Sequence, residues 1–504
     1  MHARLLTTTV GLLVLVTLPA RAEKHSARTL GTHAGGIASV HYSPDGRFLA
    51  TGGGDKAVRI WDATTGRLHH ECKGPTSFTC AVRFSPDGSL LAAAGYESGT
   101  GNVIYLFDPS KGTERGRLPG HPTGGVRRLA FTADGRRLVS AGFDGHLRVW
   151  DLDRLKEVRS FKVEAGTVYG LSLSPDGRLA ATAGRDGLRL WDLATGGEQP
   201  RSAMNRHSCV TVTFSPDGKL LASGDGACVK LWEAATGKEV KRLDSFQGEL
   251  SQILFSRDGR TLYTASYDRY LRVWEVRTGQ LIHEIQGHQG WVWGIALSPN
   301  EKHLASCSVD TKLHLWEVSE FGSAAPRARA QLTDQQFETH WKQLTSSDAG
   351  AAYRSICALA SDPGTSLPRL KVRLATRPAG EPPAPDLTQL IRHLDADIYA
   401  VREEATRQLG QLGVRALPAL QKALADRPSL EARKRLQRLL ARLDPTELPP
   451  DELLAVRGVQ ALEYIASEEA RAVLEQLARS APGVRLGEEA NQALVRLSAG
   501  PGPR

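Results

Sequence analysis

The chain has 504 residues, of which 41% are hydrophobic and 24% charged, so it is long enough for two or more globular domains and is not a disordered tail. Its 50 glycines exceed the usual share of about 7% and indicate many tight turns between short strands. The net charge of +9 has no dominant Lys/Arg cluster and does not by itself indicate nucleic-acid binding. The six cysteines include no C-x-x-C pair, so we predict no metal cluster, no haem and no other cofactor.

Residues 1–22 have the pattern of a secretory signal peptide. Arg4 precedes the apolar segment Leu5–Leu18, and Ala20-Arg21-Ala22 supplies a small–x–small cleavage site. The apolar segment is too short to span a membrane, and no later stretch reaches the ~18 consecutive apolar residues of a transmembrane helix. We expect an exported protein, periplasmic or secreted, without a transmembrane segment after cleavage. The alternative is a buried N-terminal strand or helix.

A repeat of about 42 residues fills residues 23–319. Its first mark is an aromatic residue followed by an acidic one, at Trp61-Asp62, Phe107-Asp108, Trp150-Asp151, Trp191-Asp192, Trp232-Glu233, Trp274-Glu275 and Trp316-Glu317. Its second mark is a Ser-Pro-Asp-Gly tetrad or a variant of it, beginning at Ser43, Ser85, Thr132, Ser174, Ser215, Ser256 and Ser298. One tetrad precedes each aromatic–acidic pair, so the chain contains seven repeat units.

Each unit predicts four strands. The Pro and Gly of the tetrad favour a tight turn, which separates an alternating run such as Val210–Phe214 from a second one such as Leu220–Ser223. A third strand ends in the aromatic residue, and a Thr-Gly turn leads to a fourth, as in Lys238–Leu243. The period of two in these runs is typical of half-buried antiparallel sheet.

These seven units resemble the WD40 repeat, whose blades have four strands. The resemblance implies a seven-bladed β-propeller. No Thr-Gly turn or fourth strand follows Trp316-Glu317, and Ala27–Leu30 precedes the first unit. We expect Ala27–Leu30 to pair with the last blade and close the ring, which removes both sheet edges.

Several units combine the residue types of a nucleophilic triad. The three sets are His33, Thr51, Asp55 and Trp61, then His121, Ser140, Asp144 and Trp150, and then His288, Ser306, Asp310 and Trp316. A catalytic set occurs once per site, whereas this one recurs with the repeat. The resemblance implies that it is a hydrogen-bond chain within each blade, which satisfies the buried indole N–H. Other units depart from the pattern, with Phe107 in place of Trp and with Glu164 or Gln247 in place of His.

The resemblance also suggests a partner-binding face, formed by connections that enter the first strand and leave the second strand of each blade. Carried over to this chain, the face contains Arg127, Phe143, Thr167, Tyr169, Arg185, Tyr267, Trp291 and Trp293. Aromatic and Arg side chains dominate interface hot spots. Packing between blades is the competing interpretation for Tyr169 and Trp293.

After Ser319 the composition turns to Ala, Leu and Arg. We expect a linker at 320–330, a helical HEAT-like segment at 331–375, a Pro-rich linker at 376–386 and HEAT-like α-helical repeats at 387–498. The helical spacing is clearest in the stripe Val401, Ala405, Leu409 and Leu412. An anonymous helical bundle is the alternative. The whole chain resembles exported bacterial WD40 proteins that carry a helical tail.

We predict a multidomain chain, β then α, that works as a non-catalytic scaffold for a protein or peptide partner, with the tail as a second surface. An enzyme, hydrolase-like, with a site in the propeller mouth is the alternative. A mouth-lining carboxylate or His with a shifted pKa, outside the blade sets, would favour it. Nucleic-acid binding is weaker, because of export and diffuse charge. Oligomeric state is not predicted.

Overall fold

The computed structural model describes residues 27–96, 102–122, 124–163, 166–199, 208–244, 246–319, 331–346, 348–375, 387–412, 416–426, 428–442, 448–480 and 485–498. The expected signal peptide and both expected linkers, 320–330 and 376–386, lie outside these residues.

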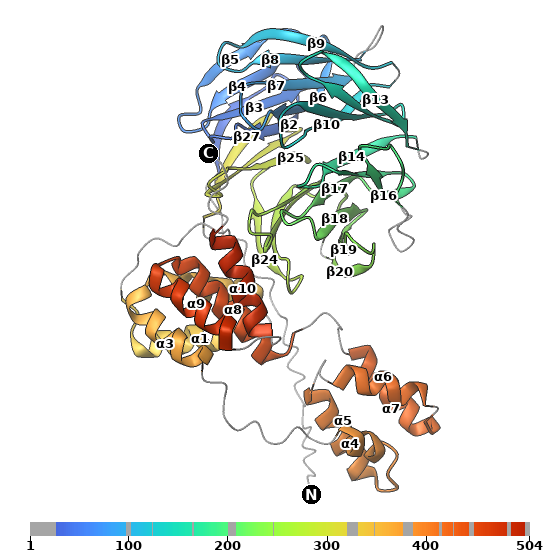
Figure 1. Ribbon diagram of the computed structural model, residues 1–504, viewed down its shortest axis with the longest axis vertical. Helices are drawn as coiled ribbons and strands as arrows, with labels where there is room; N and C mark the ends of the chain where they lie inside the picture. Colours follow the sequence, from blue (N-terminus) through green and yellow to red (C-terminus); the bar gives the residue numbers. More distant parts are fainter. Residues whose placement is uncertain are drawn as a thin grey trace, which may run out of the picture.

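Seven antiparallel sheets form a propeller, and each aligns with one sequence repeat (Figure 1). Blades one to three contain β2 (Ile37–Tyr42), β3 (Phe48–Gly53), β4 (Val58–Asp62) and β5 (Leu68–Cys72); β6 (Phe78–Phe84), β7 (Leu91–Tyr96), β8 (Asn102–Asp108) and β9 (Thr113–His121); and β10 (Val126–Phe131), β11 (Arg137–Gly142), β12 (His146–Asp151) and β13 (Lys156–Lys162). Blades four to six contain β14 (Val168–Leu173), β15 (Leu179–Gly184) and β16 (Gly187–Asp192); β17 (Thr211–Phe214), β18 (Leu220–Asp225), β19 (Cys228–Glu233) and β20 (Glu239–Asp244); and β21 (Leu250–Phe255), β22 (Thr261–Ser266), β23 (Tyr270–Glu275) and β24 (Leu281–Gln286).

Blade seven joins the two ends of the ring. It contains β25 (Val292–Leu297), β26 (His303–Ser308), β27 (Lys312–Glu317) and, as its outermost strand, β1 (Arg28–Thr32). The closing strand is therefore shifted by one or two residues from the predicted Ala27–Leu30. Leu30 is buried and shares a core with Trp61 of blade one, so β1 also ties the last blade to the first.

Blade four departs from the predicted four strands. Among the described residues it has three strands and a single bridge between Trp191 and Glu198. The sequence after this blade's turn reads Gly196-Gly197-Glu198-Gln199-Pro200. Glycine weakens a strand and proline cannot donate to a ladder, which explains why regular pairing stops there.

The helices after the propeller form two groups. Their bounds are α1 (Asp334–Gln343), α2 (Ala349–Ser361), α3 (Pro363–Ala375), α4 (Leu387–His393), α5 (Tyr399–Leu412), α6 (Leu417–Ala425), α7 (Leu430–Arg442), α8 (Pro450–Ile465), α9 (Glu468–Ser480) and α10 (Arg485–Ser498). Helices α1–α3 and α8–α10 share one core, which we call the helical block, whereas α4–α7 have a core of their own (Figure 1). None of the described helices has the length and apolarity to cross a membrane.

This grouping differs from the expected segments 331–375 and 387–498. Helix α8 packs on α2 and α3, so the chain returns to its first helices after α7. Sequence periodicity identifies the apolar stripe of a helix but does not specify which stripe faces it.

The helical block continues the core of blades six and seven. Tyr263 and Trp316 of the propeller belong to the same buried cluster as Phe337, Tyr353 and Leu474 of the helices. Helix α2 lies against the outer strand β24. Such shared burial of large side chains is the main source of stability in a domain contact.

Candidate functional site

Three blades carry the same chain of hydrogen bonds. In blade one, the two ring nitrogens of His33 each lie 2.8 Å from their partners, Asp55 and Thr51, and Trp61 donates its indole N–H to Thr51 over 2.7 Å. The same bonds link His121, Ser140, Asp144 and Trp150, and also His288, Ser306, Asp310 and Trp316. Burial raises the pKa of Asp55, but hydrogen bonds from Arg59 and His33 outweigh it and hold that pKa at about 2.

The bond to the indole persists in blades that depart from the pattern. Trp191 donates to Thr182, Trp232 to Ser223 and Trp274 to Thr264, over 2.8 to 3.0 Å. A buried indole N–H without an acceptor is costly, which explains why this bond is kept. Glu164, which replaces the histidine in blade four, lies outside the described residues.

Six residues of the predicted binding face surround one cavity of about 410 Å³ at one end of the central channel. They are Arg127, Tyr169, Arg185, Tyr267, Trp291 and Trp293. The other two do not line it. Phe143 packs edge-on against Tyr96 with ring centroids 5.4 Å apart, and Thr167 is half-buried just before β14.

The aromatic side chains of the cavity are held by one another. Tyr267 stacks on Trp291 with ring centroids 5.1 Å apart, and Phe78 meets Trp293 edge-on at 5.8 Å. Trp291 is nevertheless 53% exposed, which is unusual for a side chain of this size. An exposed indole supported from one side is ready to contact a partner without further ordering.

Sequence reasoning missed the cationic interior of the channel. Arg128 lines both this cavity and a second one of about 420 Å³ at the other end, where Arg83 and His41 also lie. Burial, and then repulsion from Arg127 and Arg83, lowers the pKa of Arg128 to about 9. Among the described residues, neither Arg83 nor Arg128 is paired with a carboxylate. The sequence does contain an indication of this cluster. Arg83 and Arg128 occupy the innermost strand of their blades, at positions where the other blades carry small or neutral residues.

His41 meets the criterion that we set for an enzyme, because it lines the channel and its pKa is strongly shifted. Burial, and then the charge of Arg83, lowers that pKa to about 3. Its Nδ1 accepts the backbone N–H of Phe84 over 3.2 Å. A base that stays unprotonated down to pH 3 is a poor general base, since catalysis requires a pKa near the working pH. The structure therefore gives His41 a structural acceptor role.

The helical block leaves this cavity open. Glu463 of the helical block forms an ion pair with Arg260, which precedes β22. Glu489 forms another with Arg277, which precedes β24. The cavity is lined by Tyr267, which follows β22. The two features therefore lie at opposite ends of the strands.

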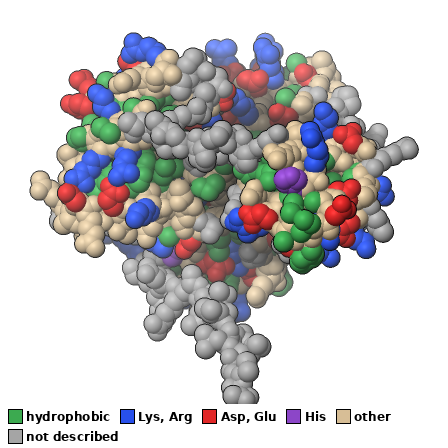
Figure 2. Space-filling view, turned by 90° about the horizontal axis from the view of Figure 1, so that it is seen from below, with side chains coloured by type: hydrophobic (Ala, Val, Ile, Leu, Met, Phe, Trp, Pro, Cys, Tyr) green, Lys and Arg blue, Asp and Glu red, His purple; other side chains and the backbone are tan. Residues whose placement is uncertain are grey.

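The face seen from below (Figure 2) carries both signs of charge. In the view from below, Lys and Arg side chains are interspersed with Asp and Glu across the face shown (Figure 2). A nucleic-acid binder concentrates basic residues along one face or stripe. This face has no such concentration among its described residues.

Comparison with known proteins identifies two repeat types. The family model "WD domain, G-beta repeat" matches residues 24–62, 66–108, 112–151, 155–192, 198–233, 237–275 and 279–317, and "PBS lyase HEAT-like repeat" matches 401–426. The chain is 30% identical over 162 residues to guanine nucleotide-binding protein subunit beta-1 of Caenorhabditis briggsae, a match that covers 31% of this chain and 46% of that relative. Since the seven WD matches together span more than half of its residues, the chain belongs to the WD40 repeat family.

Proposed function

We propose that the protein is a non-catalytic scaffold and that the cavity at the channel mouth binds a segment of a protein partner. The observation that carries the proposal is an exposed Trp291 beside a cluster of arginines in one open cavity. Aromatic and Arg side chains are the usual anchors of protein interfaces. The similarity to a subunit of a guanine nucleotide-binding protein supports the same class of function.

The segment that fits this cavity carries a carboxylate next to an apolar side chain. Arg127 and Arg128 line the cavity, and Nε of Arg127 has no hydrogen-bond partner among the described residues. A buried N–H donor without an acceptor is costly, and an incoming carboxylate removes that cost. The stacked pair Tyr267 and Trp291 supplies the apolar contact.

Selection from a random peptide library on the full chain tests this function. We expect the enriched peptides to share an Asp, a Glu or a free carboxyl terminus, and their affinity to fall with salt. Fluorescence anisotropy should show loss of binding in Trp291→Ala. Leu68→Ala is the matched control, because Leu68 is 47% exposed on the outer strand of blade one. Enrichment of basic peptides, or equal binding by both variants, would contradict the proposal.

The unit α4–α7 is the proposed second surface. It carries Ile398 and Tyr399, which are 65% and 64% exposed, and its HEAT-like match supports a role in binding. The test is a binding assay of the full chain with Tyr399→Ala for partners whose binding survives Trp291→Ala. Unchanged binding of every such partner would contradict a second surface.

Export is part of the proposal and is supported by the pattern of residues 1–22. N-terminal sequencing of the protein recovered outside the cytoplasm should begin at Glu23. Recovery of the chain from the cytoplasm with residues 1–22 intact would contradict export.

A further inference from the structure

Four blades pair their turn aspartate with a basic side chain on the third strand, two residues before the Trp. The pairs are Arg59–Asp55 at 2.6 Å, Arg148–Asp144 at 3.3 Å, Lys230–Asp225 at 2.7 Å and Arg272–Asp268 at 2.7 Å. The aspartates lie at the ends of the hydrogen-bond chains described above or at the equivalent position. A positive charge beside this aspartate is therefore a recurring element of the blade.

Blade seven has His314 at this position. The residue is only 4% exposed, and its Nδ1 lies 3.1 Å from the hydroxyl oxygen of Thr29 on the closing strand. Its Nε2 has no hydrogen-bond partner in the part of the chain that the structure describes. Blade seven thus has neither Arg nor Lys at this position, and a buried ring nitrogen is left without a partner among the described residues.

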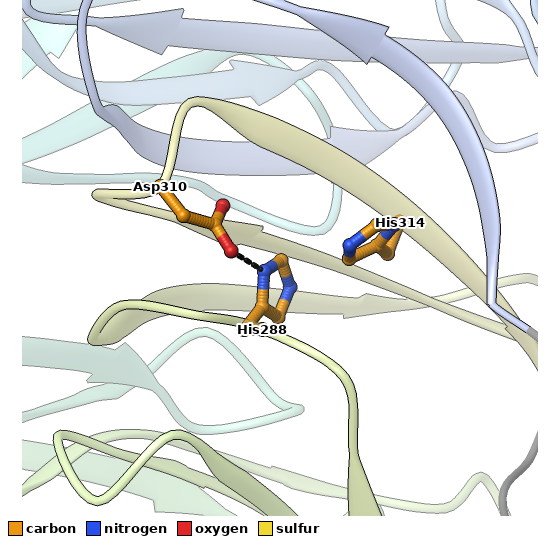
Figure 3. Close-up of side chains that lie close together, drawn as sticks. All are labelled: His288, Asp310 and His314. Carbon is orange, nitrogen blue, oxygen red and sulfur yellow. Dashed lines mark hydrogen bonds and ion pairs between the residues drawn. The ribbon is translucent and has the colours of Figure 1, made fainter.

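His314 lies beside the other two members of this cluster. One ligand atom from each of His288, Asp310 and His314 lies within 4.8 Å of the others (Figure 3). His288 Nδ1 is 2.9 Å from Asp310, and the rings of the two histidines have centroids 4.5 Å apart. The three side chains come from the approach to β25, the turn before β27 and β27 itself (Figure 3).

We propose that His288, Asp310 and His314 bind a divalent metal ion of the zinc class. Two imidazoles and one carboxylate are a donor set that suits Zn²⁺. The ion supplies the positive charge that Arg or Lys supplies in four of the six other blades. With metal–ligand bonds of about 2.0–2.2 Å, bound donors lie somewhat over 3 Å apart, so shifts of about 1 Å assemble the site.

The neighbouring residues Ser306 and Thr29 lie within hydrogen-bonding distance of the two proposed histidine ligands. His288 Nε2 lies 2.7 Å from Ser306, which also accepts the indole N–H of Trp316. When the metal takes Nδ1 of His288, the proton of the neutral ring moves to Nε2 and is donated to Ser306. In the same way, His314 binds through Nε2 and donates Nδ1–H to Thr29. Hydrogen bonds of this kind fix the tautomer and orientation of ligating histidines.

Thr29 connects the proposed metal site to the closure of the ring. It belongs to β1, which pairs with β27 and closes the propeller. An ion that binds only the closed arrangement stabilises the fold by mass action. We therefore expect zinc to raise the resistance of the ring to unfolding.

The experiment uses the full chain, freed of metal with a chelator and titrated with ZnCl₂. We expect one ion per chain by calorimetry and metal analysis, a rise in melting temperature, and visible absorption bands when Co²⁺ is used instead. The decisive variant is His314→Arg, which restores the side chain type of the other blades and should keep the fold but lose the site. His314→Gln is the second variant, in case the guanidinium does not fit.

A surface histidine pair provides the control. His69 and His70 are exposed or half-exposed neighbours on β5, and adventitious zinc would bind there. The double variant His69→Ala, His70→Ala should keep full binding. The proposal is overturned if the wild-type chain binds no zinc at about 100 µM free metal. It is also overturned if a folded His314→Arg or His314→Gln binds zinc as the wild type does.

Discussion

Arg457 of the helical block and Glu275 of blade six form a two-point ion pair. Nε and Nη2 of Arg457 donate to the two carboxylate oxygens of Glu275 over 3.2 and 2.7 Å, and the side chain of Arg457 is fully buried. Nη1 donates to the carbonyls of Leu344 and Ser346. Glu275 is the acidic partner of Trp274 in the repeat, so one of the seven repeat marks also joins propeller and helices.

Arg457→Ala should destabilise the full chain by about 3–5 kcal/mol, because it leaves a largely buried carboxylate and two carbonyls without their donor. Urea denaturation monitored by fluorescence measures the change. Arg479→Ala is the control, since the ion pair of Arg479 with Glu475 is exposed and surface pairs contribute little. Equal losses in the two variants would show that the buried pair does not hold the domains together.

Glu301 should make stability depend on pH. It occupies the last position of its tetrad, where six blades have Gly, with a φ of 54°, and it is 5% exposed. Burial raises its pKa from 4.5 to about 7. The folded state therefore holds this proton more tightly than the unfolded chain, so the contribution is full below pH 4.5 and is lost as pH rises through 7.

The variant Glu301→Gln isolates this effect from the buried histidines, whose lowered pKa values change stability in the opposite direction. Between pH 5 and pH 8 the wild type should lose roughly 3 kcal/mol relative to the variant. Denaturant titrations of both proteins at several pH values provide the measurement. Parallel profiles would contradict the role of Glu301.

On the propeller, substitutions in the cavity should weaken partner binding, whereas substitutions in the blade hydrogen-bond chains should lower stability. Trp291→Ala and Arg185→Ala should each weaken a partner peptide by about 2 kcal/mol or more, because central aromatic and Arg anchors dominate interfaces. His121→Ala should instead lower stability by about 1–3 kcal/mol, because it removes a buried hydrogen bond to Ser140 and a part-buried one to Asp144. Loss of binding in a folded His121→Ala, with binding retained by both face variants, would reverse the assignment.

Removal of residues 23–31 should lower the melting temperature of the whole ring. These residues include most of β1, whose Leu30 is buried between the first and last blades. Without β1 the sheet edge of blade seven is left open. Leu30→Ala should cost about 2–4 kcal/mol by itself, whereas Leu68→Ala should cost little. A melting temperature unchanged by the deletion would refute closure by this strand.

All six cysteines should titrate as free thiols after denaturation without reductant. Each is a free cysteine in the structure, and Cys72 packs in the core between blades one and two. Burial raises the pKa of the Cys72 thiol to about 12, which suppresses the reactive thiolate. A count of four or fewer thiols would indicate a disulfide.

The sequence was enough to predict the propeller and six of the residues that line the cavity at its channel mouth. The repeated turn and the repeated aromatic residue can be recognised in the sequence, because turn geometry and the period of two in strands depend on residues within one repeat unit. The resemblance to the WD40 repeat places Arg185, Tyr267 and Trp291 on a common face, and all three line the cavity. It also places Phe143 and Thr167 there, but these two do not line the cavity, because register alone does not say which side chain reaches the mouth.

The contacts between distant segments could not be predicted from the sequence. The helical spacing predicted helices within 387–498 but not that Arg457 on α8 would meet Glu275. The pairing of α8 with α2, rather than with α7, depends on the fit of side chains that no local pattern encodes. The contact of His314 with Thr29 on the closing strand likewise joins the two ends of the propeller sequence, which no pattern within one repeat unit encodes.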